Sequence, residues 1–198
     1  MKKKRLWIAL AGAVVLVAAA IGVAVALNSD TGDGYKLVAS PDGGRARVVA
    51  RVVQPEGYAL SEDSDVDGEE PEYYFEPESD ESPVRFLYYT TGYGDSQSVA
   101  EAAIAAYTTF YDEFASSEVA ERTLADRTFL SFDYTAAYPN AEETAMVYEQ
   151  SAVCYFPVGG DAFVVCIVSL SFDGSDAYLD AEALDAYVAQ ACGAVNLL

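Results

Sequence analysis

An uncharged apolar run near the start of the chain constrains this protein most. Residues 6–27 carry no charged side chain over 22 positions, and the four residues just before them, positions 2–5, are all basic. A helix of 22 residues rises about 33 Å, which is enough to cross a hydrocarbon core of about 30 Å. We therefore predict a transmembrane signal-anchor at residues 6–27, a cytoplasmic basic tail at residues 1–5, and an extracytoplasmic location for the rest of the chain.

A cleaved signal peptide is the alternative interpretation of the same run. Residues 24–26, Ala-Val-Ala, follow the small-x-small pattern that precedes a cleavage site. The apolar region of cleaved signal peptides is usually shorter, about 7–15 residues, so the anchor is favoured. No cysteine follows the run, because the cysteines of the chain are Cys154, Cys166 and Cys192, and this excludes lipid attachment there.

We predict that the exported part consists of a linker, residues 28–34, and one acidic domain, residues 35–198. That length suits a single domain with a sizeable core. The exported part carries seven basic and 32 acidic side chains, a net charge of −25, because the other four of the 11 basic residues lie in positions 1–5. Such a field repels nucleic acid and anionic lipid head groups, so we expect no nucleic-acid partner. Solubility, or adaptation to a salty medium, is the simplest explanation of the charge.

The patterning of the domain predicts an α+β fold, with one antiparallel sheet and two helices packed on it. The predicted strands are residues 35–39, 46–53, 84–91, 127–136, 145–156 and 162–172, residues 72–75 could form a short edge strand, and the predicted helices are residues 97–115 and 178–192.

Each predicted helix has an apolar side that we expect to be buried. The first helix should begin with a capping-box pair at Ser98 and bury one stripe that ends with Phe110 and Phe114. The second should bury Leu184 and Val188 and stop at the glycine that follows it.

The element order of the domain resembles the PsbP-like family of α/β sandwiches. An early strand leads into residues 55–58, Pro-Glu-Gly-Tyr, which look like that family's Pro-x-Gly-Trp turn, and a strand, a helix, a meander and a closing helix follow. The resemblance covers about residues 45–198, and Tyr58 in place of Trp and the acidic loop at residues 56–82 depart from it. It implies a sandwich in the membrane-anchored branch of bacterial envelope proteins and a non-enzymatic accessory role. It implies no catalytic residue in this chain.

The residue inventory excludes several catalytic chemistries. The chain has no histidine, so Ser–His–Asp and Cys–His nucleophile systems and the usual zinc sites cannot be built from it. We identify no catalytic residue and no cofactor. We predict a membrane-tethered binding or accessory module whose partner is an unknown protein or small ligand. The alternative is an extracytoplasmic hydrolase, which would need two inward-facing carboxylates about 5–10 Å apart in a cleft.

One stretch of the acidic loop has the spacing of a metal site. Asp63, Asp65 and Asp67, followed by Gly68, match the first half of a calcium loop, in which alternate carboxylates converge on a hard cation. The second half does not match, because position 12 is Tyr74 rather than Glu. A calcium-dependent interaction through this loop is a further alternative to a solvated loop with accidental spacing.

Cys154 and Cys166 are the candidate disulfide of the exported domain. If the hairpin loop is residues 159–161, Cys154 lies opposite Cys166, and if it is residues 159–160, the two cysteines point to opposite faces. An opposed pair without mutual hydrogen bonds brings the Cα atoms close enough for a bridge, and the exported setting permits it. Three buried thiols are the equal alternative.

Overall fold

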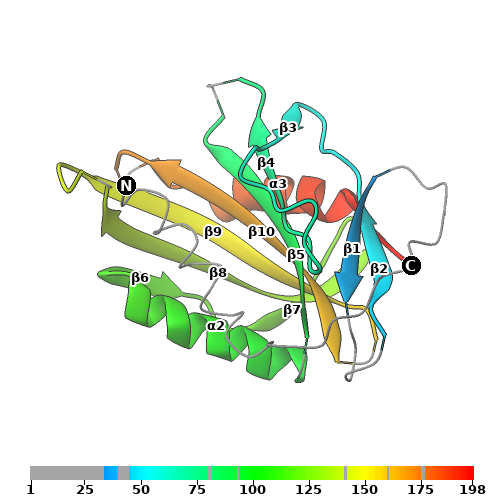
Figure 1. Ribbon diagram of the computed structural model, residues 1–198. Helices are drawn as coiled ribbons and strands as arrows, with labels where there is room; N and C mark the ends of the chain where they lie inside the picture. The colour runs from blue at the N-terminus through cyan, green and yellow to red at the C-terminus, as the bar shows by residue number, and fades with distance from the viewer. Residues whose placement is uncertain are drawn as a thin grey trace.

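The described part of the chain folds into two antiparallel sheets and two helices (Figure 1). This computed structural model describes residues 34–39, 45–79, 82–92, 94–140, 142–159, 161–174 and 177–198. The α+β prediction is confirmed, although the strands divide into two sheets rather than one. The predicted anchor at residues 6–27 lies outside the described residues, and no helix within those residues is long and apolar enough to span a membrane.

The large sheet contains seven strands on one path and an eighth at its side. In spatial order these are β3 (Tyr58–Leu60), β4 (Tyr73–Pro77), β5 (Val84–Gly92), β10 (Ala162–Phe172), β9 (Met146–Pro157), β8 (Arg127–Pro139) and β6 (Glu113–Ser116), with β7 (Ala120–Leu124) also paired to β8. All the strand pairs are antiparallel. The long predicted strands appear within a few residues of their expected bounds. β4 confirms a short strand near residues 72–75, but it lies between β3 and β5, so its predicted edge position was wrong.

The small sheet joins the two ends of the domain. It holds β1 (Tyr35–Ala39), β2 (Arg47–Val52) and β11 (Val195–Leu197), with β2 in the middle. The chain enters it through Gly34, whose φ is +116° and where an added Cβ would lie 2.8 Å from the Val52 carbonyl oxygen. Only glycine fits so close an approach with that backbone conformation. The sheet packs against the large one, where the Thr90 hydroxyl donates a hydrogen bond to the Val38 carbonyl.

The first helix, α2 (Ser96–Phe110), begins and ends earlier than predicted. Its N-cap is Asp95, whose carboxylate accepts a hydrogen bond from the Ser98 amide, so the capping-box prediction at Ser98 was wrong. It ends at Phe110 because Tyr111 is extended, with φ −95° and ψ 140°. The side chains that α2 buries are Ala100, Ala103 and Tyr107.

The apolar stripe predicted through residue 114 therefore differs from the side that α2 buries. Phe110 is 49% exposed, so the prediction that it is buried was wrong. Phe114 lies in β6 rather than in a helix and is half-buried. Tyr107 and Tyr111 rather than Phe110 face the sheet, and Phe114 packs against the same core from β6.

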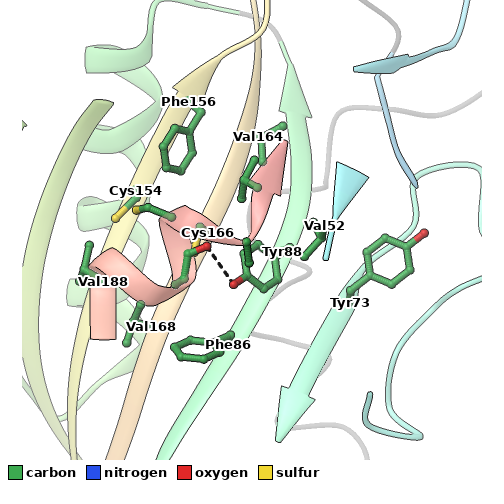
Figure 2. Close-up of a cluster of buried hydrophobic side chains, with 14 of the residues drawn as sticks. Val52, Tyr73, Phe86, Tyr88, Cys154, Phe156, Val164, Cys166, Val168 and Val188 are labelled. Atoms are coloured by element: carbon green, nitrogen blue, oxygen red, sulfur yellow. Dashed lines mark hydrogen bonds between the residues drawn. The ribbon is translucent and has the colours of Figure 1, made fainter. Parts of the chain in front are cut away.

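The second helix, α3 (Ala181–Gly193), covers the opposite face of the large sheet from α2. Its N-cap Asp180 accepts a hydrogen bond from the Ala183 amide, and Leu184 and Val188 are buried as predicted. Together with the small sheet it encloses the larger core, which includes Tyr88 and Cys154 (Figure 2). The smaller core lies under α2.

Strand β9 shows how one strand serves both cores. Ala152, Cys154 and Phe156 belong to the core under α3, and Val153 and Tyr155 belong to the core under α2. Alternate side chains of a strand point to opposite faces, so a strand covered on both sides reads as a continuous apolar run.

Candidate functional site

Glu149 in β9 is the only buried carboxylate among the residues that the structure describes, with 4% of its surface exposed. Its Oε1 accepts hydrogen bonds from the Tyr134 hydroxyl at 2.5 Å, from the Ser151 hydroxyl at 2.9 Å and from the Ser169 hydroxyl at 3.3 Å. Its Oε2 accepts one from the Tyr111 hydroxyl at 3.4 Å. Four hydroxyl donors thus satisfy the carboxylate, and we call these five residues the Glu149 cluster.

Strand register brings most of this cluster together. Tyr134 in β8 pairs with Ser151 in β9, and Ser151 pairs with Ser169 in β10, so these three side chains form one row across the sheet. Glu149 lies two residues before Ser151 and therefore on the same face. Tyr111 is the residue that follows α2, and its hydroxyl reaches Glu149 from there.

Electrostatics keep the tyrosines of the cluster in their hydrogen-bonding form. Burial raises the pKa of Tyr134 well above its ordinary value, and the nearby Glu149 charge raises it further. The pKa of Tyr111 is raised by the same two causes, in the same order. Both hydroxyls therefore stay protonated and can donate to the carboxylate across the physiological range. The arrangement holds one carboxylate in place by charge-assisted hydrogen bonds.

The paired-carboxylate chemistry of a hydrolase has no counterpart around Glu149. Every other described Asp and Glu side chain is exposed or half-buried. One surface hollow is lined in part by Ser171, which pairs with Glu149, and its described lining residues include one carboxylate, the exposed Asp173. The described residues therefore offer no second inward-facing acid to act with Glu149.

The three aspartates of the calcium-like stretch lie in the loop between β3 and β4, and all of them are exposed. The loop is held by its backbone and by hydroxyls: the Glu72 amide donates to the Asp65 carbonyl at 3.0 Å, and the Tyr74 amide donates to the Ser64 hydroxyl at 2.9 Å. In the described part of the chain, no group of three or more acidic or cysteine side chains is placed to hold a metal ion. Asp63, Asp65 and Asp67 are therefore not brought together as a ligand set.

Cys154 and Cys166 face one another across β9 and β10, which confirms the register with a three-residue hairpin loop. The Val158 amide donates to the Ala162 carbonyl at 3.0 Å, so those two residues form a hydrogen-bonded pair. Such pairs recur at every second residue, and the cysteine pair belongs to the same class, with Cα atoms typically about 5.5 Å apart. The expectation of a pair without mutual hydrogen bonds was therefore wrong.

All three cysteines are buried free thiols, and the sequence did not show that Cys192 joins the other two. The thiols of Cys154 and Cys192 contact each other, and this contact and burial raise the pKa of Cys154. Burial likewise raises the pKa of Cys166. Figure 2 shows Cys154 and Cys166 beneath α3 beside Tyr88, whose hydroxyl donates to the Ala191 carbonyl at 3.1 Å. A bridge between Cys154 and Cys166 stays a prediction.

Comparison with known proteins adds a partial structural similarity. No family model and no curated protein matches the chain. One similar solved structure is that of LpqN, a protein involved in cell envelope biogenesis of Mycobacterium tuberculosis. The two sequences are 14% identical, the match covers 75% of this chain and 82% of that chain, and the TM-score is 0.45. These comparisons do not confirm the PsbP-like family.

Proposed function

We propose that the protein is a membrane-tethered extracytoplasmic binding or accessory module without enzymatic activity. In this proposal residues 6–27 cross the cell membrane once, the N-terminus stays in the cytoplasm, and the domain binds a protein or a small ligand outside. The observation that carries the proposal is the position of the folded domain, because β1 begins at Tyr35, only eight positions after the apolar run ends. The apolar run is thus directly joined to a domain large enough to act outside the membrane.

The interior of the domain supports binding rather than chemistry. Side chains fill both cores, and the one buried carboxylate already accepts hydrogen bonds from four hydroxyls. A general acid or base must reach a substrate proton, which a carboxylate enclosed by internal donors cannot do without losing those bonds. No observation in the described residues favours the hydrolase or the calcium-binding alternative.

Analysis of the chain in fractionated cells tests the tether. We expect the full-length protein in the membrane fraction, retained in high salt, with its original N-terminal residues still present by mass spectrometry. A matched variant, in which a cleavable secretory signal replaces residues 1–27, should leave the membrane as a soluble exported domain. Recovery of the unmodified chain as a soluble exported protein that begins near residue 27 would contradict the tether and establish cleavage after Ala26.

A further inference from the structure

The basic side chains of the exported domain are concentrated in one short part of the chain. Residues 35–53 carry four basic side chains and one acidic, whereas residues 54–198 carry three basic and 29 acidic. The short part includes β1 and β2, two of the three strands of the small sheet. The domain is therefore strongly acidic everywhere except at this sheet.

The structure adds a fifth basic residue to the same place. Arg127, at the start of β8, lines a surface hollow together with Asn196 and Leu197 of β11, the third strand of the small sheet. Arg51 is buried and contributes no contact surface. The remaining four side chains, Lys36, Arg45, Arg47 and Arg127, are exposed or half-buried, and we call them the basic pole.

Three exposed apolar side chains lie in or directly after strands of the small sheet. Val53, directly after β2, is 42% exposed, and Leu197 and Leu198, at the end of β11, are 43% and 67% exposed. These are half of the six large exposed apolar residues in the described part of the chain. A surface that combines basic and exposed apolar side chains is typical of proteins that lie on a membrane interface.

The tether places this surface next to the membrane. Residues 28–34 join the predicted anchor to β1, and seven residues span at most about 25 Å even when fully extended. The small sheet contains the first strand of the domain, so it is the part of the fold with the shortest covalent path to the lipid surface. In Figure 1, the small sheet lies at the right of the molecule, and α2 runs along its lower side.

We propose that the small sheet docks on the anionic lipid head groups of the membrane that anchors the chain, through the basic pole and the exposed apolar residues Val53, Leu197 and Leu198. The inference rests on the proposed tether. Anionic head groups attract each nearby Lys or Arg, and the attraction falls off within a Debye length, about 8 Å at physiological ionic strength. The acidic remainder of the domain would be repelled from the same surface, which turns the domain so that its basic pole faces the lipid.

The net charge of −25 does not oppose this contact, because screening makes the local charge decide at short range. Asp126 and Asp161 lie in neighbouring turns and reduce the positive charge around the basic pole, but basic side chains still outnumber them. The Arg47 guanidinium also donates to the Val158 carbonyl at 3.2 Å, which fixes that side chain beside the hairpin turn.

Fluorescence quenching in vesicles tests the orientation with the full-length chain. The protein is reconstituted in phosphatidylcholine vesicles with or without phosphatidylglycerol, and a fluorophore is attached at Ala46→Cys, between Arg45 and Arg47. Ala105→Cys, on the exposed side of α2, is the matched control position. Lipids that carry a spin label on the head group quench a fluorophore that lies at the surface.

We expect phosphatidylglycerol to increase quenching at position 46 and not at position 105, and salt at about 0.5 M to abolish the increase. Arg45→Glu should abolish it too, whereas Arg85→Glu, a charge reversal on the exposed side of β5, should preserve it. Thermal melts show whether each variant is folded.

Three results would overturn the docking surface. The first is equal quenching at position 46 in both kinds of vesicle. The second is the same loss from Arg85→Glu as from Arg45→Glu, which would indicate a general charge effect. The third is quenching that follows protein density rather than lipid charge, which would assign the surface to a second copy of the chain. A chain that does not float with vesicles of either kind refutes the tether, and a chain that floats without the lipid-dependent contact refutes only the docking.

Discussion

Raising the pH above about 10 is expected to unfold this domain in one cooperative transition. Burial raises the pKa of five buried tyrosines well above the ordinary value, and two buried thiols also have raised pKa values. The groups are Tyr88, Tyr107, Tyr111, Tyr134 and Tyr155, with Cys154 and Cys166. They stay protonated in the folded state while the same groups in the unfolded chain ionise near pH 8.5 for Cys and 10 for Tyr.

The sign follows from proton binding. Because the folded state binds these protons more tightly, their contribution to stability is complete below the unfolded pKa values and is lost as the pH rises through the range above them. Each group removes about 1.4 kcal/mol of stability per pH unit, so seven groups together remove roughly 10 kcal/mol per unit. A typical domain has a total free energy of unfolding of about 5–15 kcal/mol. A rise of about one or two pH units above the unfolded pKa values therefore removes more stability than such a domain has.

Far-ultraviolet circular dichroism and tyrosinate absorbance, followed against pH, check this expectation. The buried tyrosines should ionise together with the loss of secondary structure. Tyr107→Phe is the matched variant, because the Tyr107 ring is buried, and it should make the transition shallower by about one proton. Ionisation of nearly all tyrosines near pH 10 in a chain that keeps its secondary structure would contradict the buried clusters.

Phe132→Ala should cost about 3–5 kcal/mol of unfolding free energy, the usual range for a buried phenylalanine. Phe132 is 1% exposed, and its ring contacts those of Tyr107, Tyr134 and Tyr155 in the core under α2. Truncation leaves a cavity that these large rings cannot readily close.

Phe110→Ala is the matched control, since it removes the same atoms from a side chain that is 49% exposed. We expect it to cost less than about 1 kcal/mol. Urea unfolding curves of the two variants measure the difference. Similar losses in both would show that α2 packs with the stripe that includes Phe110, contrary to the structure.

The long strands of the large sheet could be predicted because the pattern that indicates each strand lies within its own residues. Strands such as β9 and β10 are buried on both faces, so they appear in the sequence as long apolar runs between turn residues. The turn residues also predicted two registers for the hairpin, and the structure has the one in which Cys154 faces Cys166. The length of the loop could not be decided from the sequence, because Pro157 and two glycines permit both.

The short strands and the end of α2 could not be predicted. β3, β6, β7 and β11 have three to five residues each, and β6 and β11 pair with strands that are not adjacent in the chain. An alternation of apolar and polar residues is hard to recognise over so few positions. At the end of α2 the apolar spacing continued through Phe114, but packing against the sheet placed Tyr111 and β6 there.

The sequence does contain one sign of the Glu149 cluster. Glu149, Gln150 and Ser151 interrupt an otherwise apolar predicted strand. A carboxylate in such a strand needs hydrogen-bond donors from elsewhere, since burying an unpaired charge is costly. Tyr111 and Ser169, two of the donors, could not be assigned from sequence, because β-sheet register and the end of α2 bring them to Glu149.

Protease treatment of cells that produce the full-length chain tests the central claim, an extracytoplasmic domain tethered by residues 6–27, most directly. A specific cleavage site inserted between residues 28 and 34 and a tag at each terminus make the outcome easy to read. Our account predicts that protease added to intact cells, or to spheroplasts where an outer layer blocks access, releases the C-terminal tag and leaves the N-terminal tag protected in the membrane. Protection of the C-terminal tag in spheroplasts, with cleavage only after lysis, would contradict it.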